Sequence, residues 1–83
     1  MYLIVGGMKL TLDSEDLPRV SEHNWRTFYG PRHIIFERNI GTRYSPRTQP
    51  LGSFILKTFQ EVEFINPKKF TDFSKENLRI VTT

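Results

Sequence analysis

The sequence of 83 residues contains no cysteine, and this absence removes several kinds of chemistry at once. Without thiols the chain has no disulfide to brace a small fold, no thiolate zinc site and no cysteine nucleophile. The lack of cysteine also fits a reducing compartment. Only two histidines are present, His23 and His33, so these are the only candidates for an imidazole base.

Long apolar runs are missing as well. Residues 1–5 form an apolar stretch, but Gly6 and Gly7 end it far short of the apolar core of a signal peptide, and no basic stretch precedes it. No segment reaches the ~18 apolar residues that a membrane span requires. We therefore expect a cytoplasmic protein.

The residues that are present indicate one small globular domain over residues 1–83. Hydrophobic residues make up 37% of the chain and aromatic residues 13%, which is enough for a thin core. The net charge of +3 is unevenly distributed, because residues 1–25 hold two basic and four acidic groups, whereas residues 26–83 hold ten and five. A basic C-terminal part favours phosphates or an acidic protein surface as the partner, although an ordinary solvated surface explains the same balance.

Apolar alternation and turn residues predict an α+β fold, a small antiparallel sheet with short helices. The first part, residues 1–50, is expected to hold strands that pair around Gly6-Gly7 and Gly30-Pro31 and one short helix, which Asp13 or Ser14 caps. The prolines of residues 42–50 and their lack of a period predict a loop there. The expected elements of the whole chain are strands at 2–5, 8–12, 25–29, 33–38 and 62–66, helices at 14–22, 51–59 and 74–78, and a tail at 79–83 that can pair as a strand.

Two stretches resemble one known family, in that family's order. The first comprises residues 12–17 (LDSEDL) and 20–25 (VSEHNW); the second comprises residues 51–56 (LGSFIL), 62–66 (VEFIN) and 71–82 (TDFSKENLRIVT). They are similar to the opening segment and to the "LHRLIL … VDHIN … NLRivT" core of phage and bacterial HNH homing endonucleases with an AP2-like segment. The resemblance implies that residues 51–83 form a reduced ββα-metal hairpin-helix, and that the protein acts in a bacterial host if a phage encodes it.

The resemblance also implies that catalysis has been lost. The family's general base is the histidine of "DH", and that position is Phe64, which takes no proton. The histidine and arginine of "LHR" fall on Gly52 and Ser53. A catalytically inactive relative, with no catalytic residues, is therefore expected, and a weak metal-dependent nicking endonuclease is the less favoured alternative.

The metal site implied by the resemblance is reduced to two residues. Glu63 takes the place of the acidic metal ligand, and Asn77 matches the last ligand of the family. One carboxylate and one amide make a vestigial, weak Mg²⁺ site, because Mg²⁺ gives up its waters reluctantly. The alternative is a surface glutamate and an asparagine that braces a short helix.

Two kinds of partner follow from these departures. The favoured function is DNA binding through a basic face, because phosphate contacts give affinity without the metal or the base. The alternative is a small phage-encoded inhibitor that binds a host or defence protein through an apolar interface of Phe64, Phe70 and Phe73. If Phe64 and Phe73 face inward instead, they only enlarge the core. A homodimer that buries edge strands is also open. The candidate DNA-binding residues are Arg26, Arg38, Arg43, Arg47, Lys68 and Lys69, with Arg32, Lys75 and Arg79 as further basic residues.

Overall fold

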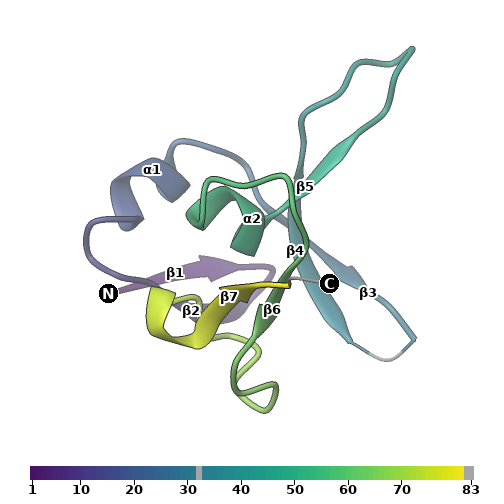
Figure 1. The fold of residues 1–83 in the computed structure, drawn as a ribbon. Coiled ribbons are helices and arrows are strands. Elements are labelled where there is room, and N and C mark those ends of the chain that lie inside the picture. Colours follow the sequence, from purple (N-terminus) through teal and green to yellow (C-terminus); the bar gives the residue numbers. More distant parts are fainter. Residues whose placement is uncertain (32, 82–83) are drawn as a thin grey trace.

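The computed structural model describes residues 1–31 and 33–81, and it confirms the α+β class. Within these ranges, seven short strands form three antiparallel sheets, accompanied by two short α-helices and one 3-10 turn (Figure 1). Arg32 of the basic set, and Thr82 and Thr83 of the expected last strand, lie outside the described residues. In chain order the elements are β1 (Tyr2–Val5), β2 (Met8–Thr11), α1 (Leu17–Ser21), β3 (Arg26–Tyr29), β4 (Ile34–Asn39), β5 (Thr48–Pro50), α2 (Leu51–Ile55), β6 (Val62–Phe64), the 3-10 turn η1 (Lys75–Asn77) and β7 (Leu78–Ile80).

The first hairpin, β1–β2, turns where the two glycines predict it. Gly6 and Gly7 both have positive φ angles, 57° and 82°, a backbone region that residues with a Cβ atom rarely enter. Gly6 also lies so close to Thr27 that a Cβ atom would stand 2.4 Å from the threonine hydroxyl. The hairpin is therefore both turned and docked onto β3 through a position that only glycine fits.

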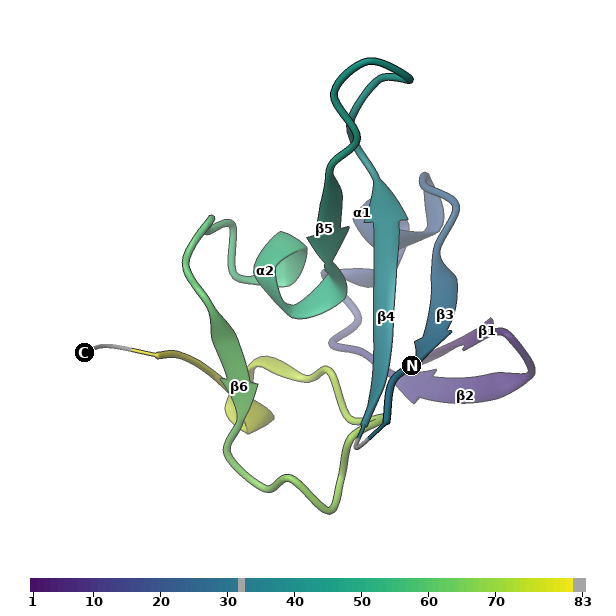
Figure 2. The ribbon, with the colours of Figure 1, turned by 90° about the vertical axis from the view of Figure 1, so that its right-hand side faces the viewer.

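The three-stranded sheet, in the order β3-β4-β5, corrects the prediction of a loop over residues 42–50. Thr48–Pro50 pairs with Glu37–Asn39 as strand β5. A proline is tolerated there because it stands at the end of an edge strand, where no ladder donor is needed. Beyond the paired residues, the chain projects from the body as a hairpin tip (Figures 1 and 2), and we call residues 40–47 the arm.

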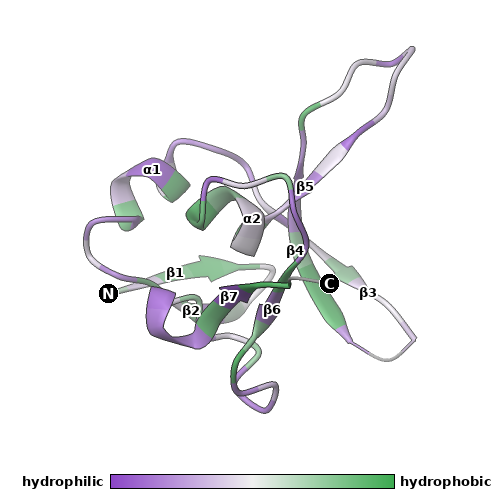
Figure 3. Cartoon of the chain, in the orientation of Figure 1, coloured by the Kyte–Doolittle hydropathy of each residue, from purple (hydrophilic) through white to green (hydrophobic). Residues whose placement is uncertain are grey.

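The arm is an ordered turn. The amide of Ile40 donates to the carbonyl of Arg47 at 3.0 Å, and Thr42 and Ser45 exchange backbone hydrogen bonds of 3.1 and 3.2 Å. A Cβ atom on Gly41 would stand 2.2 Å from the carbonyl oxygen of Ser45, so the turn also needs a glycine. Figure 3 shows the arm as mostly hydrophilic or neutral, whereas the green apolar segments concentrate in the strands of the body.

The helices are shorter than their patterns predict. α2 begins where expected but ends at Ile55, four residues early, and Lys57 then takes a left-handed φ of 55° that stops the helix. α1 begins at Leu17 with Pro18 in its first turn, as proline requires. Its N-cap is Asp16 and no side chain caps it, so the expected cap from Asp13 or Ser14 is absent. The expected helix at the end of the chain is the single turn η1, which lies between β6 and β7.

Backbone bonds between distant segments join the two parts of the chain into one core. Thr11 donates to the carbonyl of Thr71 at 2.9 Å and accepts from the amide of Phe73 at 2.8 Å, so β2 lies beside the segment before η1. The amide of Lys75 donates to a carboxylate oxygen of Asp13 at 3.0 Å. No helix of the described residues has the length and apolarity needed to cross a membrane. The buried apolar residues are Val5, Leu10, Leu12, Val20, Phe36, Leu51, Ile55, Phe73 and Leu78.

Candidate binding surfaces

Positions that carry chemistry in the resembled family come together around one groove. This groove has a volume of about 470 Å³, and its lining residues come from β4, β6, the start of α2 and the segment after β6. Gly52, Ser53, Glu63, Phe64 and Phe73 all line it. Four of the five positions that the resemblance marks, 52, 53, 63 and 64, therefore lie around the groove, whereas Asn77 does not line it.

The groove is apolar where a nuclease would be polar. The ring of Phe64 packs edge-on against Phe73, with 5.2 Å between centroids, and Phe73 packs in the same way against Phe36 at 5.7 Å. Phe73 is only 5% exposed, so its expected role in an exposed interface is wrong, and it belongs to the core instead. Phe64 is half-buried, and Phe70 is 38% exposed at the rim.

The two candidate metal ligands are engaged in other contacts. The carboxylate of Glu63 accepts a hydrogen bond from Arg79, its partner in the β6–β7 pair. The Asn77 side chain is buried, its oxygen accepts from the amide of Asn66 at 2.9 Å, and its nitrogen donates to the carbonyls of Lys69 and Asp72. Asn77 therefore braces the loop between β6 and η1. With Glu63 paired to Arg79 and the Asn77 side chain held by three hydrogen bonds, the two residues do not fit the Mg²⁺ site that the resemblance implied.

The two histidines lie in different surroundings. His23 packs edge-on against Phe54 at 5.3 Å, and its Nδ1 lies 3.3 Å from the guanidinium of Arg38. His33 is one of the residues that line the groove.

The predicted basic residues do not form one continuous face. Arg38 is half-buried, its Nε donates to Gln49 at 2.9 Å, and its guanidinium lies 5.2 Å from the ring centre of Phe54. Arg26 pairs with Glu37 across β3 and β4 at 3.3 Å. These two arginines brace the sheet. Of the remaining candidates, one pair is on the arm and the other, Lys68 and Lys69, is on the loop after β6 at the opposite end of the molecule (Figures 1 and 2).

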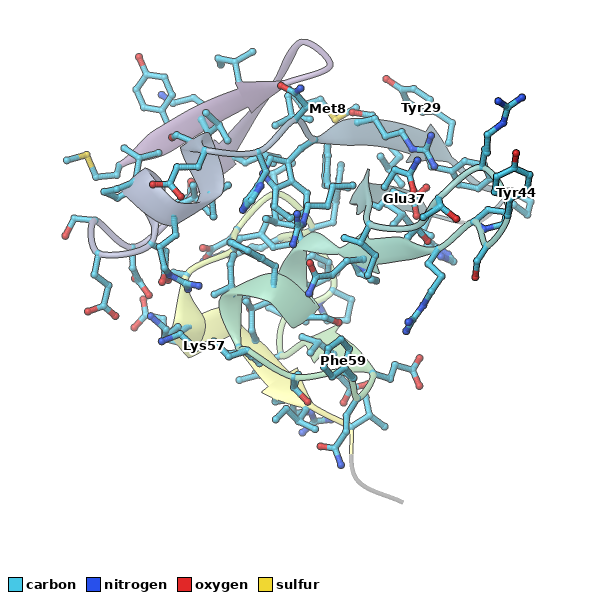
Figure 4. All side chains as sticks on the ribbon, turned by 90° about the horizontal axis from the view of Figure 1, so that it is seen from above. Met8, Tyr29, Glu37, Tyr44, Lys57 and Phe59 are labelled. Atoms are coloured by element: carbon cyan, nitrogen blue, oxygen red, sulfur yellow. The ribbon has the colours of Figure 1, made fainter. Side chains whose placement is uncertain are left out.

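The arm carries two exposed arginines beside an exposed tyrosine. Arg43 and Arg47 are exposed and have no ion-pair partner within the described parts of the chain. Tyr44 between them is 88% exposed, and the Arg43 guanidinium stacks 5.6 Å from its ring centre. Figure 4 shows Tyr44 at the outer edge of the molecule. No acidic residue occurs from Arg38 to Pro50, so the arm carries positive charge without an offsetting carboxylate of its own.

A buried ionic cluster near α1 was not predicted from the sequence. The Asp16 side chain is almost fully buried, and it accepts from Arg19 at 2.8 Å and from Lys75 at 2.9 and 3.0 Å. Burial favours the neutral acid, but these hydrogen bonds outweigh it and hold the pKa of Asp16 below its ordinary value. Hydrogen bonds first to Glu15 and then to Asp16 raise the pKa of Lys75. The Lys75 ammonium therefore neutralises the carboxylates of Glu15 and Asp16, and we assign the cluster a structural role.

No family model matches this chain, and no curated protein or solved structure matches it. The resemblance to the endonucleases therefore stays a prediction that rests on the motifs alone.

Proposed function

We propose that this protein is a non-catalytic DNA-binding module whose arm makes the main contact with duplex DNA. The proposal rests on the exposed Arg43-Tyr44 pair and on Arg47, which lie together on the arm. The arm is an ordered hairpin that projects from the body and contains no acidic residue. A two-stranded β-ribbon fits the major groove of B-DNA, and arginine forks bind phosphates or guanine edges there.

The internal hydrogen bonds of the arm support this role. A turn that is already closed between Ile40 and Arg47 loses little conformational entropy when DNA binds it. The stacked Arg43 and Tyr44 side chains share one surface, which suits a phosphate next to a sugar or base edge. Affinity in this arrangement comes mainly from counterion release, so binding is expected to weaken steeply as salt rises.

The test is fluorescence anisotropy of labelled duplex DNA over a series of NaCl concentrations. Replacing both Arg43 and Arg47 with alanine removes up to two phosphate contacts, so the slope of log K against log salt is expected to fall by about 1.8. The matched control replaces Lys68 and Lys69 with alanine, which removes the same charge from the opposite end of the molecule. This control is expected to keep the slope nearly unchanged.

Two results would contradict the proposal. Equal slope losses in the two double variants would mean that net charge, and not the arm, governs binding. Absence of binding by the wild-type protein at low salt would reject the DNA-binding function altogether. Gel analysis of supercoiled plasmid in the same samples with Mg²⁺ tests the expected absence of nicking.

A further inference from the structure

The groove between β4 and β6 has no part in the proposed DNA contact, and its chemistry is opposite to that of the arm. Its walls are mostly apolar, with Ile34 and Phe36 on one side and Val62 and Phe64 on the other. Among the described residues that line it, the charged ones are Glu61 and Glu63, and no lysine or arginine takes part. In a chain of net charge +3, this is an apolar slot with an acidic rim.

The rim leaves one carboxylate available to a ligand. Glu63 already accepts a hydrogen bond from Arg79. Glu61 is exposed, and its side chain has no ion-pair partner within residues 1–31 and 33–81. A fitting ligand therefore combines a flat apolar group, which enters between Phe64 and Phe70, with a neighbouring cation that reaches Glu61.

The chain itself displays such a ligand. On the arm, Tyr44 is 88% exposed and stands between Arg43 and Arg47, which lack ion-pair partners among the described residues. The amphipathic ring of tyrosine has the shape and polarity of an interface anchor, and arginine is the preferred partner of a carboxylate at such a site. The arm and the groove are therefore complementary in hydrophobicity and charge.

Their placement at opposite ends of β4 permits a closed pair of molecules. The groove is lined by the beginning of β4, Ile34–Phe36, whereas the arm follows the end of β4 after Asn39 (Figure 2). Two copies with antiparallel β4 strands therefore present each arm to the other copy's groove. Such a twofold arrangement makes both contacts at once and leaves no complementary surface unsatisfied.

We infer that the groove binds the arm of a second copy, so that two chains form a dimer by reciprocal insertion of Tyr44 with Arg43 or Arg47 at Glu61. The inference does not depend on the proposed DNA binding, although both use the arm. Where both hold, duplex DNA and the second copy compete for the same two arginines, and DNA is expected to separate the dimer.

The test is sedimentation velocity of the full chain over a range of protein concentrations without DNA. The apparent mass is expected to rise from the 9.8 kDa of one chain towards twice that value. Two variants, Glu61→Arg and the double variant Arg43→Glu with Arg47→Glu, are each expected to remain monomeric, because in each variant the groove and the arm carry charges of the same sign.

Mixing these two variants provides the decisive measurement. In the mixed pair, the basic groove of one chain meets the acidic arm of the other, while the second contact has the wild-type charges. The dimer is therefore expected to return, which a loss of folding could not produce. A wild-type mass of 9.8 kDa at every concentration would overturn the inference, as would a dimer that persists in both variants or fails to return on mixing.

Discussion

Replacing Asp16 with asparagine tests whether the buried ionic cluster holds the two parts of the chain together. Asp16 is 1% exposed and accepts hydrogen bonds from Arg19, three residues away, and from Lys75, in the C-terminal part. An asparagine keeps the size of the side chain but directs an amide group, with two protons to donate, towards two cations.

The magnitude follows from the bonds that are lost. Hydrogen bonds to a charged group contribute about 1.5–3 kcal/mol each, but both partners of Asp16 are partly exposed and recover water when the charge is removed. We therefore expect the Asp16→Asn variant to lose about 2 kcal/mol of unfolding free energy in all. For a domain of this size, such a loss lowers the melting temperature by about 10 °C.

The matched control is Glu15→Gln. Glu15 also pairs with the Lys75 ammonium, at 2.6 Å, but its side chain is 71% exposed, so water replaces most of what the substitution removes. Urea unfolding, followed by the fluorescence of the single tryptophan Trp25, measures both variants. Similar losses in the two variants would refute the argument that burial makes the Asp16 contact strong.

The pH dependence provides a second check. The folded pKa of Asp16 lies below its ordinary value, so its contribution is complete above the unfolded pKa of about 3.9 and is lost as pH falls through the lower, folded pKa. The stability gap between the wild-type protein and Asp16→Asn should therefore be constant near neutral pH and should narrow below about pH 4. A gap that stays constant in acid would show that the charge of Asp16 is not its source.

Two further substitutions test the groove and the loss of catalysis. Phe73→Ala should cost about 3–5 kcal/mol in urea unfolding because Phe73 is a core residue, whereas Phe70→Ala at the rim should cost about 1 kcal/mol, and equal costs would contradict the assignment of Phe73 to the core. Phe64→His should not restore Mg²⁺-dependent nicking of supercoiled plasmid, because the other family positions remain unsuitable. The Asn77 side chain is held by three hydrogen bonds. Gly52 stands at the position of the "LHR" histidine, and a Cβ atom there would lie 3.0 Å from Val62. Nicking above background by this variant would show that the site retains more function than its geometry indicates.

Local patterns in the sequence were sufficient to predict the features that depend on interactions between residues close in the chain. Gly6 and Gly7 predicted the first hairpin, because the turn needs backbone angles that other residues rarely adopt. The alternation of Met8, Leu10 and Leu12 with polar residues predicted which face of β2 is buried. The starts of most strands and of α2 followed in the same way.

Features that depend on long-range contacts could not be predicted. Residues 48–50 form a strand because β4 offers them a free edge, and no pattern within the segment itself indicates this pairing. Phe73 was expected at an exposed interface, yet packing against Phe36 and Phe64 buries it. Ion pairing follows the same rule, since Asp16 and Lys75 meet only when the N-terminal and C-terminal segments lie side by side.

The basic residues show most clearly which features the sequence predicts and which depend on the fold. The sequence alone gives the number of basic residues and their concentration after residue 25. Only the fold shows which of them stabilise the sheet and which are left exposed to a partner. Arg38 packs into the sheet, Lys68 and Lys69 lie at one end, and the arm carries Arg43 and Arg47 at the other. Charge is a property of each side chain, but the surface that a partner meets depends on which charges the folded backbone leaves exposed and unpaired together.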